Sequence, residues 1–463
     1  MAAKYNMQLS IIMKKREILE LTVDKLNFGG EGISFFEDKK VVYKNGIPGQ
    51  KVRILIKKIR KNKIDGKILD ITAPSPLESE NVCNHYSICG GCSLLSVSYH
   101  RQVLIKKNQI KEMFLESGHD EFENMEMIPS PIHLEYKNKM EFTFGNEEKD
   151  APLALGMHMT NRSNSIVYVN TCKIIDEDYR KILSATCEYF RHKDLPFYRI
   201  LSHAGYLRHL VVRKGQNTGE ILVNIVTTSQ IEFDMSDYVK LLNNLVLDGS
   251  ITGILHTVND SYSDAVICDS MEILYGRDYF YDRLLGLKFK ISPFSFFQTN
   301  TKCAEVLYSV TKEMLGDKKD KIVYDLYSGT GTIGILISEN AKKVYGIELI
   351  EEAVEMAKEN CLINNIDNAI YIAGDVAQEV SKLSEKPDVI IIDPPRSGVH
   401  PKAMKDIIAF DSKEIIYVSC NPKALVEDLH KLKDSGYKIL QVKGVDQFPN
   451  TPHAEVIVHL KKQ

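Results

Sequence analysis

The sequence KIVYDLYSGTGTIG at residues 321–334 determines the fold class of the C-terminal part of this 463-residue chain. Its first six residues are mostly apolar, with Ile322, Val323, Tyr324 and Leu326, as is typical of a buried strand. Gly329, Gly331 and Gly334 follow, and glycines at this position allow a tight turn and a close approach of a ligand to the backbone. The stretch therefore predicts a strand, a turn and a helix of an open α/β sheet.

Three further strand-like runs continue this pattern, and each ends at or near an acid: Glu348, Asp375 and Asp393. An acid after the second strand can accept hydrogen bonds from ribose hydroxyls. The glycine spacing also fits a dinucleotide fingerprint, so a nicotinamide dehydrogenase is an alternative. Asp375 suits the adenine side of a nucleoside, and Asp393 begins a rigid turn with two prolines. This order resembles the class I S-adenosylmethionine-dependent methyltransferase fold, a Rossmann-like α/β domain.

A cysteine follows another buried run, at Ser419-Cys420-Asn421-Pro422. In open α/β sheets, ligands bind at the carboxyl ends of the strands, so Cys420 is a candidate nucleophile. A buried, inert thiol is the alternative interpretation. Because the thiolate is the reactive form, we expect the surroundings of Cys420 to lower its pKa.

Cys83, Cys89 and Cys92 are close together in one loop, and Cys172 is the best candidate for a fourth ligand. Four thiolates suit either an iron–sulfur cluster or structural zinc. In a zinc site His85 could replace one thiol, and an empty reduced site is the third possibility. The spacing alone leaves these alternatives open.

Residues 14–72 alternate short strand-like runs with glycine turns, which predicts a small β-barrel of the oligonucleotide-binding type. Between Lys51 and Lys67 the local charge is +7, which favours phosphate binding through counterion release. Lysines that protect a strand edge would explain the same pattern. A Pro-Ser-Pro linker at residues 74–76 separates this module from a mixed region, so we expect domains at 14–72, 75–290 (α+β, with the cysteine loop) and 291–463.

The overall composition is that of an ordinary globular protein, with 44% hydrophobic and 26% charged residues. The net charge is −3, so a uniformly basic surface is excluded and any contact with nucleic acid needs a local patch. No secretion signal or membrane-spanning run is visible, and we expect a cytoplasmic protein. Nine cysteines in such a protein indicate metal binding or catalysis more than disulfides.

Several motifs together resemble the 5-methyluridine RNA methyltransferases, specifically those that modify large-subunit ribosomal RNA. The chain reproduces their Cys-x5-Cys-Gly-Gly-Cys pattern, their Ser-Cys-Asn-Pro tetrad and their Pro-His-x-Glu stretch, here at residues 452–455. Residues 14–72 resemble a TRAM module, an RNA-binding barrel. The chain departs from the family at Ser328, where relatives often have cysteine, and at Ala454, where many have valine.

The resemblance implies a role for each matching residue. It implies a 4Fe–4S cluster on Cys83, Cys89, Cys92 and Cys172. It implies that Cys420 is the nucleophile and Glu455 the general base. The implied contacts to S-adenosylmethionine are Gln298, Tyr327, Glu348, Asp375 and Asp393.

The implied activity is transfer of a methyl group from S-adenosylmethionine to carbon 5 of a uridine in RNA. The RNA that the resemblance favours as the target is 23S rRNA. Transfer RNA is the alternative substrate. Cytosine 5-methylation is disfavoured, because Arg396 and not cysteine follows Pro395. A non-catalytic RNA-binding assembly protein and an iron–sulfur redox sensor are the other classes. RNA is the expected partner, with no membrane and no obligate protein partner.

Overall fold

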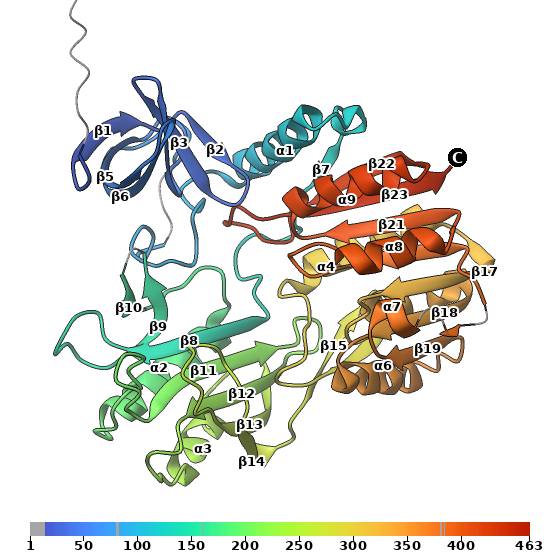
Figure 1. The fold of residues 1–463 in the computed structure, drawn as a ribbon. Helices are drawn as coiled ribbons and strands as arrows, with labels where there is room; N and C mark the ends of the chain where they lie inside the picture. Colours follow the sequence, from blue (N-terminus) through green and yellow to red (C-terminus); the bar gives the residue numbers. More distant parts are fainter. Residues whose placement is uncertain (1–13, 80–82, 161, 380–381, 384) are drawn as a thin grey trace, which may run out of the picture. The chain divides into compact units, whose positions relative to one another are not determined.

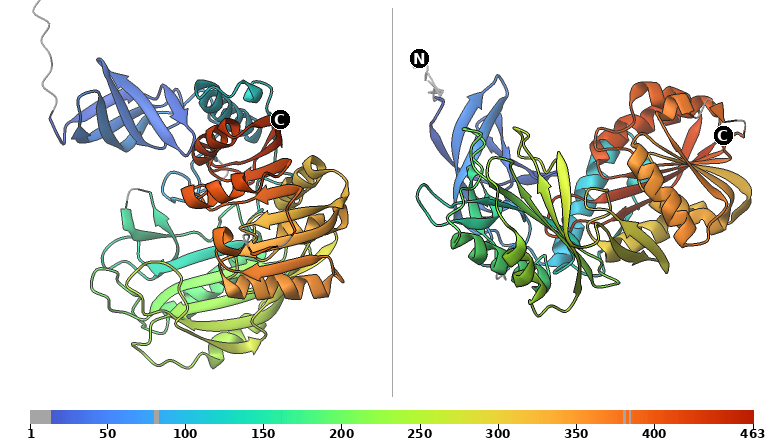
Figure 2. Two further views of the ribbon diagram at one scale, coloured as in Figure 1. Left: turned by 45° about the vertical axis from the view of Figure 1, so that its right-hand side comes forward. Right: turned by 90° about the horizontal axis from the view of Figure 1, so that it is seen from below.

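The computed structural model describes residues 14–79, 83–160, 162–379, 382–383 and 385–463. The chain divides into two compact units, Met1–Glu80 with Ser96–Arg101, and Asn81–Leu95 with Gln102–Gln463. The three domains expected from the sequence stay a prediction. Figure 1 and Figure 2 show the elements of each unit.

The first unit contains one six-stranded sheet in the order β1-β5-β6-β4-β3-β2. Its core-facing side chains alternate with outward ones, as in β5, where Val52, Ile54 and Ile56 are buried. The basic side chains of this sheet are partly paired, for example Arg53 with Asp70 at 2.9 Å. The strands are β1 (Ile18–Thr22), β2 (Lys25–Asn27), β3 (Glu31–Phe36), β4 (Lys39–Lys44), β5 (Lys51–Ile59) and β6 (Lys63–Ala73).

A seven-stranded sheet forms the middle of the second unit, in the order β10-β9-β8-β11-β12-β13-β14. Among the described strand pairs of this sheet, only β12 and β13 run parallel. A separate two-stranded hairpin of β15 and β16 follows. The elements are β8 (Lys139–Gly145), β9 (Ala154–Met159), β10 (Arg162–Tyr168), α2 (Glu177–Arg191), β11 (Leu207–Lys214), β12 (Glu220–Thr227), α3 (Ser236–Asn243), β13 (Ser250–Val258), β14 (Ser270–Gly276), β15 (Phe280–Leu284) and β16 (Leu287–Ile291).

An eight-stranded sheet forms the C-terminal part of the second unit, in the order β19-β18-β17-β20-β21-β23-β22-β7. The strands from β19 to β21 are parallel and β23 runs antiparallel to β21. Helices cover both faces (Figure 1, Figure 2), which explains why β20 is buried and apolar along its whole length. β7 lies far from its partner β22 in sequence and pairs with it in parallel at the sheet edge.

The strands of this sheet are β7 (Glu126–Ile128), β17 (Lys318–Leu326), β18 (Ala341–Glu348), β19 (Ala369–Ala373), β20 (Val389–Ile392), β21 (Glu414–Ser419), β22 (Tyr437–Val445) and β23 (Glu455–Lys462). The remaining helices are α1 (Tyr99–Glu116), α4 (Thr301–Leu315), α5 (Thr332–Ile337), α6 (Glu351–Ile363), α7 (Val376–Glu379), α8 (Pro401–Ala409) and α9 (Pro422–Asp434), with short 3-10 turns at Asp120–Phe122 and Ser338–Asn340.

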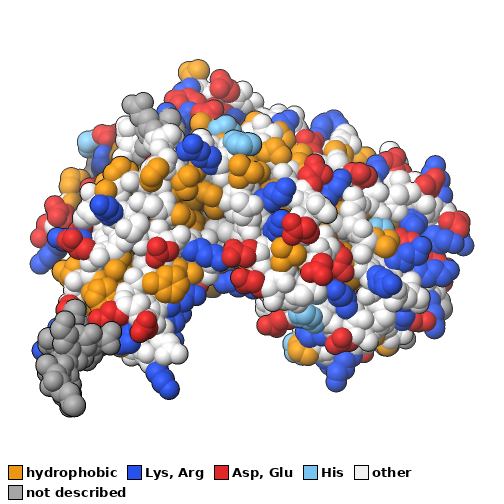
Figure 3. Space-filling model, turned by 90° about the horizontal axis from the view of Figure 1, so that it is seen from above, with side chains coloured by type: hydrophobic (Ala, Val, Ile, Leu, Met, Phe, Trp, Pro, Cys, Tyr) orange, Lys and Arg blue, Asp and Glu red, His pale blue; other side chains and the backbone are white. Residues whose placement is uncertain are grey.

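The visible surface carries interspersed basic and acidic side chains, as the small net charge predicts (Figure 3). Within the described ranges, none of the helices has the length and apolar character needed to cross a membrane.

Candidate active site

The glycine-rich loop after β17 is held by the acid at the end of β18. Tyr327 adopts a left-handed backbone with φ of 64°, and Gly329 follows with φ of 54°. Glu348 Oε2 accepts a hydrogen bond from Gly329 N, and its Oε1 accepts one from Ile350 N, each at 3.0 Å. The predicted ribose acceptor therefore also fixes the loop and the start of α6.

Two of the loop glycines are required by an aromatic ring from β19. A Cβ on Gly331 would lie 2.7 Å from the Tyr371 ring, and one on Gly334 would lie 2.5 Å from its hydroxyl oxygen. That hydroxyl donates to Gly331 O at 2.9 Å. The glycine spacing thus reflects packing against Tyr371 as well as access for a ligand, which the sequence analysis did not anticipate.

Asp325, which the sequence analysis did not select, is a buried acid at the base of this loop. Its Oδ2 accepts from Gly334 N at 2.8 Å, and within the described part of the chain Oδ1 has no hydrogen-bond partner. Burial raises the pKa of Asp325 to about 7, and the charges of Asp393 and Glu348 add to this effect. The sequence signal that could have identified Asp325 is an acidic residue near the end of an otherwise apolar strand.

The other predicted acids lie close by. Burial raises the pKa of Asp393, which follows β20, to about 7. Asp375 is exposed after β19, and its charge acts on the Tyr327 hydroxyl. Burial, followed by the charges of Asp375 and Asp428, raises the pKa of Tyr327 to about 12. The carboxyl ends of these strands therefore carry an excess of negative charge.

Gln298 is buried where the chain enters α4. Its Oε1 accepts from Gln447 Nε2 at 3.3 Å, and its side chain also bonds to the Tyr308 hydroxyl. Burial raises the pKa of Tyr308 well above its usual value, and the charges of Asp393 and Glu455 act in the same direction. Tyr308 thus lies among three of the predicted site residues.

The turn that carries Cys420 is fixed on both sides. Asn421 caps α9 through its side chain, which accepts from Lys423 N, and Pro422 occupies the first helical position. Asn421 Nδ2 also donates to Arg396 O at 2.7 Å. The Asp-Pro-Pro-Arg turn and the Ser-Cys-Asn-Pro turn are thereby joined.

Cys420 and Glu455 lie close enough to affect each other's ionisation. The pKa of Cys420 is raised to about 11, chiefly by burial and then by the charges of Glu455 and Asp393, which Arg396 opposes. The expectation of a lowered pKa for the Cys420 thiol was therefore wrong. The physical reason is that burial and two nearby carboxylates disfavour the negatively charged thiolate. The single guanidinium of Arg396 is too little to offset their combined effect on the pKa.

Glu455 is only 2% exposed, at the first position of β23. Burial raises its pKa well above the usual value, the Asp393 charge adds to this, and Arg396 opposes it. Its Oε2 has no hydrogen-bond partner among the described residues. A buried carboxylate with a raised pKa and a free oxygen is suited to accept a proton.

The loop before Glu455 is held by α1, more than 300 residues earlier in the chain. Lys106 and Asp446 form a fully buried ion pair, and Lys106 Nζ also donates to Phe448 O at 2.9 Å. Gln102 Nε2 donates to Asn450 Oδ1 at 3.0 Å, and Gln102 Oε1 accepts from Asn450 N at 2.9 Å. These contacts fix the approach of the chain to β23.

Asn450 also contacts the cysteine loop. Its backbone oxygen accepts from Ser93 N at 3.0 Å and Leu94 N at 3.1 Å, directly after Cys92. Tyr136 Oη donates to the neighbouring Pro449 O at 2.9 Å. The loop that leads to Glu455 and the loop that carries three cysteines are therefore parts of one hydrogen-bonded structure.

The four predicted thiols line one cavity. Burial raises the pKa of Cys172 to about 11, and it raises the pKa of Cys89 and of Cys92, with the charges of the neighbouring thiols acting in the same direction. Gly91 N donates to Cys89 Sγ at 3.4 Å. Among the described residues no three His, Cys, Asp or Glu side chains are arranged to hold a single metal ion.

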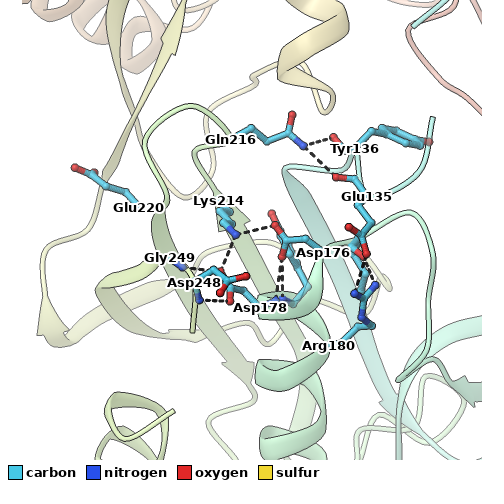
Figure 4. A network of polar contacts seen from close by, with 12 residues as sticks. Glu135, Tyr136, Asp176, Asp178, Arg180, Lys214, Gln216, Glu220, Asp248 and Gly249 are labelled. Carbon is cyan, nitrogen blue, oxygen red and sulfur yellow. Dashed lines mark hydrogen bonds and ion pairs between the residues drawn. The ribbon is translucent and has the colours of Figure 1, made fainter. Parts of the chain in front are cut away.

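Arg180, near the start of α2, lies in a network of polar contacts in which it pairs with Glu135 (Figure 4). Arg180 donates to Cys172 O at 3.0 Å and to Ile175 O at 2.6 Å, and it pairs with Glu135 at 2.8 Å. His85 Nε2, a possible zinc ligand in the sequence analysis, instead bonds to Thr171 Oγ1 at 2.9 Å.

Comparisons with known proteins agree with this architecture. Residues 98–463 match the family model described as tRNA (uracil-5-)-methyltransferase, and residues 13–69 match the TRAM domain. The chain is 52% identical to an RNA methyltransferase of Clostridium tetani, covering 97% of this chain and 99% of that protein. It is 46% identical to an RNA methyltransferase of Caldanaerobacter subterraneus, covering 97% of this chain and 100% of that protein.

A solved structure is similar along almost the whole chain. This is the Pyrococcus abyssi tRNA (uracil-54, C5)-methyltransferase in complex with S-adenosyl-L-homocysteine. The TM-score is 0.74 and the identity 27%, covering 96% of this chain and 100% of that chain.

Proposed function

The chain belongs to the tRNA (uracil-5-)-methyltransferase family and is an S-adenosylmethionine-dependent RNA methyltransferase, and we propose that it methylates uridine through a covalent bond to Cys420. The observation that carries this proposal is the grouping of Cys420, Glu455 and Asp393, whose charges act on one another at the carboxyl ends of the strands.

The electrostatics of the site favour a cationic ligand. Asp325 and Asp393 have pKa values raised to about 7, chiefly by burial. A positive charge in the same space would stabilise the ionised carboxylates, because opposite charges favour the charged form. S-adenosylmethionine carries a sulfonium cation, and its product, S-adenosylhomocysteine, is neutral at sulfur. The proposed cofactor residues are Gln298, Tyr327, Glu348, Asp375 and Asp393.

The proposed chemistry explains why a thiol is needed. Carbon 5 of uracil is a weak nucleophile. When Cys420, as the thiolate, donates an electron pair from Sγ to carbon 6, the electrons of the carbon 5–carbon 6 double bond move to form an enolate and carbon 5 becomes nucleophilic. Carbon 5 then forms a bond to the methyl carbon as the sulfonium–methyl bond breaks, and the sulfur keeps that electron pair.

Glu455 completes the reaction. Its carboxylate takes the proton from carbon 5, the carbon 5–carbon 6 double bond re-forms, and the bond between Cys420 Sγ and carbon 6 breaks. A base paired in a helix offers neither ring face, so the target uridine is unpaired or flipped out.

We assign the target to large-subunit ribosomal RNA, on the cysteine pattern that the chain shares with enzymes of that specificity. Transfer RNA is a second candidate, because the similar Pyrococcus abyssi enzyme acts on tRNA. Mapping of 5-methyluridine by mass spectrometry, in ribosomal and transfer RNA from cells with and without the gene, separates the two.

We further propose that Cys83, Cys89, Cys92 and Cys172 hold a 4Fe–4S cluster. The proposal is supported by the shared cysteine pattern and by the four thiols that line one cavity. The Gly91 N–H that faces Cys89 Sγ is typical of cluster ligands. Analysis of iron and acid-labile sulfide in anaerobically purified protein tests this assignment.

The decisive test of the methyl-transfer proposal uses RNA with 5-fluorouridine at the target. Carbon 5 of this base has no proton to lose, so the wild-type protein is expected to remain covalently attached. A Cys420→Ala variant should form no adduct. Adduct formation that survives in Cys420→Ala, or no adduct with the wild type on either RNA, would overturn the proposal.

A further inference from the structure

The hairpin of β15 and β16 carries an alternating row of aromatic rings and cations on one face. In β15, Phe280, Asp282 and Leu284 are buried, so Tyr281 and Arg283 point to the other face. In β16, Phe289 and Ile291 are buried, so Lys288 and Lys290 do the same. Their register places Tyr281 opposite Lys290 and Arg283 opposite Lys288.

The members of this row are in contact. Lys290 Nζ lies 4.5 Å from the Tyr279 ring centroid, and Arg277 lies 4.7 Å from it. Arg277 lies 5.1 Å from the Tyr281 ring, and Lys288 Nζ lies 3.6 Å from it. We call Arg277, Tyr279, Tyr281, Arg283, Lys288 and Lys290 the hairpin strip.

The strip is rigidly attached to the helix that follows Glu348. Asn364 Oδ1 of α6 accepts from Lys288 N at 2.9 Å, and Asn364 Nδ2 donates to Lys288 O at 2.7 Å. Asn360 Oδ1 accepts from Lys290 N at 2.7 Å. The side chains of these two asparagines thus make the backbone hydrogen bonds that a neighbouring strand would otherwise make at the edge of β16. The row of side chains therefore has a fixed position relative to α6.

The charge of the strip is only partly neutralised. Arg277 pairs with Glu220 and Lys290 with Glu359. In the described part of the chain, Arg283 and Lys288 form no ion pair. Two cations without acidic partners, beside two partly exposed tyrosines, match the needs of a nucleic acid strand, whose phosphates attract cations and whose bases stack on aromatic rings.

We propose that the hairpin strip binds a single-stranded segment of the substrate RNA. This inference rests on the proposed function, because it takes RNA as the substrate. Single-stranded RNA fits better than a duplex, because aromatic stacking needs unstacked bases. An acidic protein would use the cations and leave the rings unexplained.

The test measures binding of the full-length protein to a substrate RNA fragment over a range of salt concentrations. In Arg283→Gln/Lys288→Gln, two phosphate contacts are lost, so the slope of log K against log salt should fall by about 1.4. Tyr281→Leu should weaken binding by about 5- to 100-fold with little change of slope. The control is Lys240→Gln/Lys461→Gln, which removes the same charge from two exposed lysines elsewhere.

Steady-state kinetics provide the second measurement. Strip variants should raise KM for RNA and leave kcat at saturating RNA unchanged, because the strip lies outside the reacting groups. Slope and affinity equal to those of the lysine control would overturn the inference. The 5-fluorouridine adduct separates the two proposals. If the wild-type protein forms no adduct, the proposed function fails, even if the strip variants bind RNA weakly. If the wild-type protein forms the adduct and the strip variants bind RNA as well as wild type, only the strip proposal is rejected.

Discussion

Replacing Glu455 by Gln should separate methyl transfer from the step that follows it. The side chain is 2% exposed and its pKa is raised well above the usual value, so a neutral amide of the same size should fit without unfolding the site. Addition of Cys420 to the ring and transfer of the methyl group do not need the base. Removal of the carbon 5 proton does need it.

The expected loss follows from the role of a general base. Such a group contributes about 10²–10⁴ in rate, which corresponds to about 3–5 kcal/mol of transition-state stabilisation. Turnover by Glu455→Gln should fall by that factor. Because the blocked step comes after methyl transfer, the variant should accumulate a covalent complex with ordinary RNA, without fluorine.

The assay incubates the variant with target RNA and methyl-labelled S-adenosylmethionine and separates the products on a denaturing gel. A slow-migrating RNA–protein band that contains the label is expected. Glu455→Gln/Cys420→Ser should lose the band. Glu427→Gln makes the same chemical change at an exposed position of α9 and should behave as wild type. A slow variant without the labelled band would refute the assignment of Glu455 to proton removal, as would nearly normal turnover.

Three further predictions concern charge. The pKa of Cys420 is raised to about 11, so alkylation of the cofactor-free protein by iodoacetamide should speed up about tenfold per pH unit between pH 7 and 10, and Arg396→Gln should slow it at fixed pH. The folded-state pKa of Asp325 is raised to about 7 from 3.8, so the folded state binds more protons and loses stability as pH rises through this interval. Asp325→Asn should therefore stabilise the cofactor-free protein above pH 7, by up to about 4 kcal/mol, and show no gain in thermal unfolding at pH 3. Lys106→Met should lower the free energy of unfolding, measured with urea, by about 3–5 kcal/mol, because it leaves Asp446 buried and unpaired. Adding Asp446→Leu should recover most of this loss. An unchanged free energy of unfolding in Lys106→Met would contradict the buried ion pair.

The sequence predicted the parallel part of the C-terminal sheet well, because its strands are buried on both faces and read as apolar runs. Acids at the strand ends stand out against such runs, which is why Glu348 and Asp393 could be selected as candidates and placed at the ends of β18 and β20. Asp325 was passed over because it lies inside a motif that the glycines already explained. Tyr371 was missed because its contacts with Gly331 and Gly334 bring together residues 40 and 37 positions apart, and no local pattern reports them.

The pKa of Cys420 shows a different limit of sequence analysis. The tetrad correctly located the thiol at a strand end, but the direction of its pKa shift depends on which charges surround it in space. Glu455 and Asp393 approach from two other strands and raise the pKa, and Arg396 alone opposes them. The raised pKa of Cys420 disfavours the thiolate. A cationic cofactor bound near these carboxylates would reverse part of this effect, so we expect cofactor binding to precede attack on the uridine.

The connection between the cysteine loop and Glu455 bears on what a cluster would do in this enzyme. Methyl transfer moves no net electrons, so the reaction gives a redox group no task. Asn450, with φ of 65°, lies five positions before Glu455 and accepts hydrogen bonds from Ser93 N and Leu94 N, next to Cys92. Whatever fixes the conformation of the cysteine loop therefore also fixes the segment that leads to the proposed base. If the four thiols hold the proposed cluster, it would act on catalysis by fixing the segment that carries the proposed base Glu455. Loss of the thiols should then lower kcat before it affects the binding of S-adenosylmethionine.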